Sequence, residues 1–384
     1  MKYMTDRAWM EVDLDAVEQN YRTLSAQLAP SRIMAVVKAD AYGLGAVPVA
    51  RVLEQAGCEM FAVACIEEAI ELRESGLRSP ILTLGPVAPE HTALAARNHV
   101  WMPAISLHQA KALSDAAVRE GVRPVVQIKV DVGLSRFGLP LCDEERAFAD
   151  VCAIFALPSL DVRGVFTQYT TASPSENDAL NRAQIARFHA FCDRLRAAGY
   201  TFEEHGAASD FTVQYPEARA DFVRIAALLI GIAEESPCQT ASFRARIYQI
   251  KELPAGTPVG YGPLAYTQRP TRLGVVPVGY ADGIRRIMAQ PPRFLVRGKW
   301  APVIGKICMD YLMLDLTDIP EAEENDVVTL FGRGGAEHCE AWELAERYPG
   351  AVGEVTCTLV ARIPRFYTRG GVIVGRLDEE ENAQ

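Results

Sequence analysis

The sequence predicts an α/β protein in which an N-terminal (β/α)8 TIM barrel is followed by a C-terminal, mainly β domain. Two observations predict this fold. Over roughly the first 220 residues, short β-branched runs alternate with amphipathic segments, and from about residue 238 strand-like runs follow one another with few helices between them. We place the barrel at residues 10–237 and the β domain at 238–384, and we expect residues 1–9 to associate with the β domain.

Eight strands are expected in the first part of the chain. Helix-like segments alternate with them, and the clearest has apolar residues at Leu180, Ile185, Phe188 and Leu195. A doubly wound open sheet is the alternative, but the GxGxxG nucleotide fingerprint is missing after the first strand. The expected strands are 32–38, 60–65, 80–84, 99–104, 124–132, 160–169, 201–206 and 221–226, and the helices include 46–55, 67–75, 106–120 and 177–198.

The second part of the chain is dense in strand-like runs that glycine and proline separate. One late helix is expected at residues 340–346. The expected strands are 242–250, 272–280, 293–298, 301–305, 311–316 and 326–332.

Composition excludes several classes of function. The net charge of −10 argues against nucleic acid as a partner, because phosphate binding needs a basic face. The longest apolar run, residues 225–233, is too short to span a membrane. Nine cysteines without a CxxC pair predict a reducing cytoplasm, and scattered histidines without HExxH predict that no metal is bound.

Cationic side chains recur where the predicted barrel strands end. In a (β/α)8 barrel, functional residues gather at the carboxyl ends of the strands. Two lysines and two arginines with few acids indicate an anion-binding mouth with an amine nucleophile, which suggests a phosphate-bearing aldehyde cofactor. The residues at these ends are Lys38, Lys129 with Arg136, Gln168, His205 with Ser209, and Arg224.

Each of these residues also has a purely structural interpretation. Lys38 could pair with Asp40, with about even odds on position alone, and Lys129 could form a buried pair with Asp131. His205 is more often a structural histidine than a catalytic one. None of them would establish a function singly.

Several longer motifs are distinctive. AVVKADAYGLG (35–45) and IKVDVGLSRFG (128–138) are similar to the lysine-bearing signature and the lysine-to-arginine stretch of the alanine racemase family. Four strings resemble motifs of the second domain: PVGYG (258–262), VPVGYADGIRR (276–286), IGKICMDYLMLDLTD (304–318) and ARIPRFY (361–367). Together they cover nearly the whole chain, which makes the resemblance specific.

The resemblance implies a homodimeric racemase that uses pyridoxal 5'-phosphate and interconverts L- and D-alanine. Lys38 would hold the cofactor as an aldimine and act as the base on one face of the substrate α-carbon. Tyr261, from the partner subunit, would serve the opposite face.

Other roles carry over from the family residue by residue. Arg136 would bind the cofactor's phenolic oxygen and lie near the substrate carboxylate, Lys129 would be a candidate for carboxylation, and Arg224 would face the pyridine nitrogen. The phosphate would be held by Tyr42, Ser209, Ala226 and Ala227. From the partner, Met309 would bind the substrate carboxylate, and Tyr280 and Asp310 would line the entrance.

The chain departs from the family pattern at four places, three in the barrel half and one in the β domain. Gln168 replaces a histidine, Ala208 replaces an asparagine, and Arg224 is followed by Ile-Ala-Ala instead of Pro-Gly-Ile. Gly353 replaces the tyrosine expected before Glu354, which normally contacts the phosphate and bounds the substrate pocket. The space at Gly353 suggests serine or another larger amino acid as an alternative substrate, unless a neighbour such as Ile225 fills it. A non-catalytic cofactor-binding relative is a further alternative, although it would need no second base.

Overall fold

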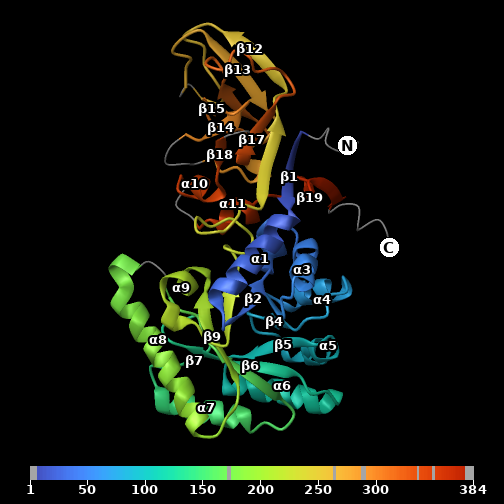
Figure 1. The fold of residues 1–384 in the computed structure, drawn as a ribbon, viewed down its shortest axis with the longest axis vertical. Coiled ribbons are helices and arrows are strands. Elements are labelled where there is room, and N and C mark those ends of the chain that lie inside the picture. The colour runs from blue at the N-terminus through green and yellow to red at the C-terminus, as the bar shows by residue number, and fades with distance from the viewer. Residues whose placement is uncertain are drawn as a thin grey trace. The chain divides into compact units, whose positions relative to one another are not determined.

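The computed structural model describes residues 7–170, 174–262, 265–286, 291–334, 337–347 and 351–376, without the side chains of 174–176. The chain divides into two compact units (Figure 1). The barrel unit comprises Tyr21–Ala39 and Ala50–Leu229. The β unit comprises the described residues within Met1–Asn20, Asp40–Val49 and Ile230–Gln384.

Eight parallel strands close into a barrel in the barrel unit. All eight correspond to the strands predicted from the sequence, so the predicted barrel is confirmed. The open-sheet alternative is wrong, because β10 pairs with β2 and β5 pairs with β6, leaving no free edge. The strands are β2 (Arg32–Val36), β3 (Met60–Val63), β4 (Ile81–Thr83), β5 (Val100–Ala104), β6 (Val125–Asp131), β8 (Asp161–Phe166), β9 (Glu203–Ala208) and β10 (Phe222–Ile225), with the short β7 (Leu139–Pro140) beside β6.

Helices connect successive barrel strands, as expected for parallel pairing. Capping signals set some of their ends: the Ser106 hydroxyl accepts a hydrogen bond from the Gln109 amide at 3.1 Å, and Gly121 ends the same helix with a φ of +63°. The connecting helices are α3 (Ala46–Gln55), α4 (Ile66–Glu74), η1 (Pro89–His91), α5 (Thr92–Arg97), α6 (Leu107–Glu120), α7 (Glu144–Phe155), α8 (Pro174–Ala197), α9 (Ser209–Gln214) and η2 (Pro216–Ala218), and α1 (Leu14–Leu28) precedes β2.

The long helix α8 has the expected buried face with one exception. Ile185, Phe188 and Leu195 are buried, whereas Leu180 is 49% exposed. None of the helices in the described part of the chain is long and apolar enough to cross a membrane. All nine cysteines are free thiols.

Strand β1 (Ala8–Asp13) occupies the interior of the larger sheet of the β unit. It pairs antiparallel with β11 (Ala241–Arg246) and parallel with β19 (Arg365–Arg369). The sheet also contains β14 (Arg293–Val296), β15 (Lys299–Pro302), β17 (Val327–Gly334), β18 (Glu337–Cys339) and β20 (Val372–Arg376). A second sheet contains β12 (Gln249–Leu253), β13 (Thr271–Val276) and β16 (Leu312–Asp315), and η3 (Tyr280–Asp282), α10 (Ala341–Ala345) and α11 (Gly353–Cys357) complete the described elements.

The helical turn α2 (Lys38–Gly43) has an unusual backbone. Residues 39–43 all have positive φ, between +49° and +82°, and only the last of them is glycine. A left-handed turn costs an L-residue roughly 1–2 kcal/mol. The turn is held by a hydrogen bond from the Ala46 amide to the Asp40 carboxylate at 2.7 Å, and by one from Arg365 Nε to the Gly43 carbonyl at 3.1 Å. The strain therefore lies directly after Lys38, the predicted cofactor lysine.

Ala39→Gly should leave the free energy of unfolding unchanged or raise it by up to about 1 kcal/mol. Glycine removes roughly 1–2 kcal/mol of left-handed strain, which exceeds the roughly 0.5–1 kcal/mol that glycine costs in the unfolded chain. Ala39 is exposed, so no packing is lost, and its amide can still donate to Glu68 Oε1. Urea unfolding measures the difference.

Ala190→Gly is the matched control, because Ala190 is an exposed alanine within the right-handed helix α8. It should lower the free energy of unfolding by about 1 kcal/mol. Equal losses at the two positions would contradict the left-handed strain.

Candidate active site

A cavity of about 260 Å³ in the barrel unit is lined by four cationic side chains, those of Lys38, Lys129, Arg136 and Arg224. No carboxylate is among its lining residues in the described part of the chain, which also include Ala64, Leu84, Gly85, Phe137, Phe166 and Gln168. Lys38 comes two residues after β2, Lys129 lies in β6, Gln168 follows β8 and Arg224 lies in β10. The structure thus brings together most of the predicted strand-end residues, at a cavity suited to an anion.

Arg224 is buried and its terminal nitrogens are engaged. Nη1 donates to His205 Nδ1 at 2.7 Å, and Nη2 donates to the carbonyls of Thr167 at 2.9 Å and Gly206 at 2.8 Å and to Gln168 Oε1 at 2.9 Å. Burial, together with Arg136, lowers the pKa of Arg224 to about 10, which leaves the guanidinium protonated at neutral pH. Within the described residues these contacts engage both Nη atoms and leave Nε–H as its remaining donor.

His205 is fixed in one neutral tautomer. Because its Nδ1 accepts from Arg224, its Nε2 carries the proton and donates to Gln127 Oε1 at 2.5 Å. Burial and the positive charges of Arg224 and Lys129 lower the pKa of His205 well below its usual range. His205 therefore supports Arg224 without adding another charge.

Lys129 is only 4% exposed and sits over the ring of Phe166, with Nζ 4.7 Å from the ring centroid. Burial, reinforced by Arg224 and Arg136, lowers the pKa of Lys129 to about 7, and the opposing effect of Asp131 is smaller. The Asp131 carboxylate instead accepts hydrogen bonds from the amides of Gly133 and Ser135, both at 2.9 Å. The Asp131 carboxylate therefore has hydrogen-bond partners other than Lys129. A buried Lys129–Asp131 pair is not needed to satisfy it.

Ser209 is the first residue of helix α9. It directly follows Ala208, which replaces an asparagine of the family pattern. Its buried hydroxyl oxygen accepts a hydrogen bond from the Ala226 amide at 3.0 Å. Two of the four residues predicted to hold a phosphate, Ser209 and Ala226, are therefore already in contact with each other. The hydroxyl proton of Ser209 is still available to donate to a ligand.

Tyr42 and Gly353 meet in the β unit. A Cβ atom on Gly353 would lie 3.1 Å from Cδ1 and 3.3 Å from Cε1 of the Tyr42 ring. Tyr42 is therefore the residue that faces Gly353. This contact gives no support to the expectation that Ile225, a residue of the barrel unit, fills the space there. The ring of Tyr42 therefore lies directly beside the point where the expected tyrosine side chain would begin.

The four residues expected from the partner subunit all belong to the β unit. Tyr261 is 67% exposed, Met309 53% and Tyr280 39% in the single chain, and the Asp310 side chain is 44% exposed. Among the described residues no cluster of histidine, cysteine, aspartate and glutamate could hold a metal ion.

Two supporting residues were missed from the sequence. Gln127 accepts from His205, and the Phe166 ring stacks on the His205 ring with centroids 4.8 Å apart. A signal existed for Gln127, because it lies two positions before Lys129 in the same strand, and residues two apart share a face.

Comparison with known proteins agrees with this architecture. Residues 12–234 match the family described as alanine racemase, N-terminal domain, and residues 240–367 match alanine racemase, C-terminal domain. An alanine racemase of Desulforamulus reducens is 37% identical over 376 residues, which are 95% of this chain and 100% of the relative.

Solved structures give the same result. An alanine racemase of Clostridium difficile has a TM-score of 0.89 at 29% identity, with 97% of this chain and 98% of that chain covered. An alanine racemase of Bartonella henselae, described as having covalently bound pyridoxal phosphate, has a TM-score of 0.85 at 27% identity, with 94% and 100% covered.

Fold and site together define a two-domain (β/α)8-barrel protein with a lysine-bearing, anion-binding cavity. The resemblance seen in the sequence motifs is confirmed by the matches to both domains. This chain belongs to the alanine racemase family.

His205→Phe should destabilise the protein by about 2–6 kcal/mol. Phenylalanine can still stack on Phe166, but Arg224 Nη1 and Gln127 Oε1 each lose a buried hydrogen-bond partner, which costs about 1–3 kcal/mol per group. Urea denaturation measures the loss.

The control is the same substitution at the exposed His108. His108→Phe should change the free energy of unfolding by less than about 0.5 kcal/mol. Similar losses at both positions would mean that the His205 hydrogen bonds contribute little.

Proposed function

We propose that this protein is a pyridoxal-phosphate-dependent racemase that interconverts L- and D-alanine. The observation that carries the proposal is the cavity in which Lys38 lies beside three other cations without a lining carboxylate. Family membership supports it, as do relatives named alanine racemase that are 32–37% identical over most of the chain.

The residues present fit pyridoxal phosphate, because a cationic cavity suits its phosphate and phenolate groups. Lys38 would hold it, Arg136 would bind its phenolic oxygen, and Arg224 would donate to its ring nitrogen. A guanidinium that stays protonated cannot readily pass its proton on. Its phosphate would be held by Tyr42, Ser209, Ala226 and Ala227. When bound, the cofactor would acidify the α C–H bond of the substrate.

Racemisation needs one base on each face of the α-carbon, since one face must lose a proton and the other must gain one. We assign the Lys38 amine to one face and the Tyr261 hydroxyl to the other. The Met309 backbone N–H and Arg136 would orient the substrate carboxylate, and Tyr280 and Asp310 would line the entrance.

We further propose a homodimer in which each β domain completes the partner's site. The exposure of Tyr261 and Met309 in the single chain supports it, because side chains that act on substrate are expected to be covered when the site is complete. The bounds 10–237 and 238–384 are our proposed domain limits. We propose the cytoplasm as the location, in keeping with nine free thiols.

No observation favours the alternative functions over alanine racemisation. The expectation of a serine-sized opening rested on Gly353, and the ring of Tyr42 occupies the adjacent space. A non-catalytic cofactor carrier would have no use for Tyr261 together with Lys38.

Mixing inactive Lys38→Ala with inactive Tyr261→Phe chains should restore alanine racemisation to about one quarter of the wild-type rate. After random exchange about half of the dimers are mixed, and one of the two sites in each mixed dimer has both wild-type groups. A chiral assay of alanine in D2O, which follows both inversion and deuterium incorporation at the α-carbon, measures it.

The control mixture contains no wild-type chain. One of its chains carries both substitutions and the other carries Lys38→Ala, so no site is intact. This mixture should stay inactive. Failure of the first mixture, with subunit exchange demonstrated, would contradict the shared site. Absence of racemisation by the wild-type protein would contradict the function itself.

We also propose that Lys129 carries a carboxyl group. With a pKa of about 7, a large share of its amine is neutral at physiological pH and can add CO2 with release of a proton. The negative carbamate would then neutralise part of the positive cavity. Protein equilibrated with ¹³C-bicarbonate should show one carbamate resonance by NMR that is lost in Lys129→Ala.

The control is Lys111→Ala at an exposed helical position, which should leave that resonance intact. A spectrum without a carbamate signal at neutral to mildly alkaline pH would overturn the modification.

A further inference from the structure

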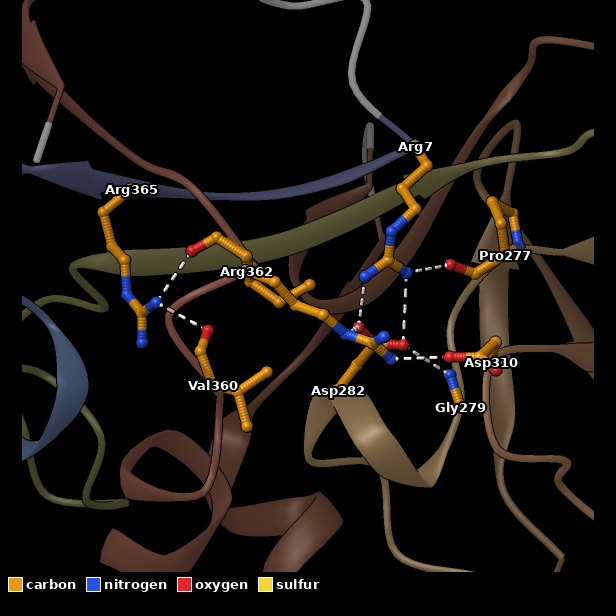
Figure 2. Close-up of polar contacts among 9 residues, drawn as sticks. Arg7, Pro277, Gly279, Asp282, Asp310, Val360, Arg362 and Arg365 are labelled. Carbon is orange, nitrogen blue, oxygen red and sulfur yellow. Dashed lines mark hydrogen bonds and ion pairs between the residues drawn. The ribbon is translucent and has the colours of Figure 1, made fainter. Parts of the chain in front are cut away.

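Asp282 is a fully buried carboxylate in the β unit, at the end of the turn η3. It accepts from both terminal nitrogens of Arg7, at 3.2 and 2.5 Å, from the Gly279 amide at 2.9 Å and from Arg362 Nε at 2.8 Å (Figure 2). Arg7 also donates to the Pro277 carbonyl. A buried carboxylate with this many donors is a fixed point of the structure.

Arg362 joins this buried carboxylate to a second, exposed one. While Nε contacts Asp282, Nη2 donates to Asp310 at 2.9 Å, and Figure 2 shows the guanidinium lying between the two carboxylates. The side chain of Asp282 has no exposed surface, whereas that of Asp310 is 44% exposed. One planar guanidinium thus fixes the position of Asp310, the residue next to Met309.

The segments on either side of this cluster are also clamped through their backbones. The Tyr280 amide donates to the Cys308 carbonyl at 3.0 Å, and the Ala281 amide to the Met309 carbonyl at 2.9 Å. A Cβ on Gly279 would lie 2.3 Å from both of these carbonyl oxygens, so only glycine permits this approach. Tyr280 and Met309 are therefore held in one rigid pair of turns.

Four charges balance in this cluster: Arg7 and Arg362 against Asp282 and Asp310. Loss of one arginine leaves Asp282 with the other, whereas loss of both leaves a buried carboxylate without a cation. The two arginines should therefore act non-additively. Arg7 is the first described residue, just before β1, and it contacts Asp282 more than 270 positions later in the chain.

We infer that Arg7, Asp282 and Arg362 are positioning residues that fix the turns presenting Tyr280, Met309 and Asp310 to the substrate. The inference rests on the proposed function, because it takes Met309 as a residue that binds the substrate carboxylate. None of the three residues needs to touch the substrate. They act by setting the direction of the Met309 amide.

Arg7→Gln and Arg362→Gln should each raise the KM for alanine about tenfold, comparable to losing one hydrogen bond to a carboxylate, and leave kcat within about twofold. The bases Lys38 and Tyr261 are unchanged in both variants. Arg362→Lys should not rescue KM, because a lysine lacks the planar fork that reaches both carboxylates. The double variant should lose more than the product of the single effects.

Amide hydrogen exchange gives a second readout that needs no substrate. In both single variants, peptides covering residues 279–284 and 307–311 should exchange at least about tenfold faster, because the clamp between them opens more often. The matched control is Arg369→Gln, which removes an arginine of β19 that pairs with Asp15 and Glu18 of α1. It should change neither KM nor the exchange of these peptides.

The two readouts separate the possible failures. An unchanged KM and unchanged exchange in folded Arg7→Gln and Arg362→Gln would overturn the positioning role. Faster exchange with an unchanged KM would also overturn it, because the turns would then be mobile without consequence for the substrate. Wild-type protein without racemase activity would overturn the proposed function, and hydrogen exchange would still report on the clamp. Asp282→Asn is the less informative variant, since it leaves two arginines without a buried partner and can unfold the β unit.

Discussion

Concentrated positive charge in the barrel cavity is the constraint to which its surroundings respond. Lys38, Lys129, Arg136 and Arg224 line one small space, and two of them, Lys129 and Arg224, are buried from the water that would otherwise screen them. The neighbours reduce the repulsion without adding acid: His205 stays neutral, and carbonyl oxygens accept the Arg224 hydrogens. Burial and the neighbouring cations also lower the pKa of Lys129. Such a cavity is electrostatically complete only when it contains an anion.

Backbone strain after Lys38 is the second costly feature. A turn of four non-glycine residues in the left-handed region persists only where surrounding contacts outweigh its cost, on the order of several kcal/mol. Arg365 supplies one such contact. Its buried guanidinium donates to the Gly43 carbonyl and to the carbonyls of Leu359, Val360 and Ile363, so it joins the turn to the last segment of the β unit. Figure 2 shows the contact with Val360. Lys38 and Tyr42 belong to different units although only three residues separate them.

The sequence predicted all eight barrel strands because each is a short apolar run whose signal is local. It did not predict β1, whose partners β11 and β19 lie more than 200 residues away in the chain, nor the left-handed turn, since residues 39–42 have no glycine. The cationic site residues were found from strand ends and motifs. Their supports, Gln127 and Phe166, were missed because a glutamine or phenylalanine in a strand is ordinary, and only the folded barrel puts both against His205.

Gly353 shows how far the consequence of a missing side chain depends on its neighbours. Replacing a tyrosine by glycine removes a large side chain, which is why an opening suited to larger substrates was expected. A Cβ at position 353 would lie 3.1 and 3.3 Å from two ring atoms of Tyr42, closer than ordinary van der Waals contact, so a side chain there would require the ring to shift by a few tenths of an ångström. The glycine and the tyrosine are thus direct neighbours although 311 positions separate them in the sequence. Substrate range therefore has to be argued from the position of Tyr42 as well as from the missing side chain.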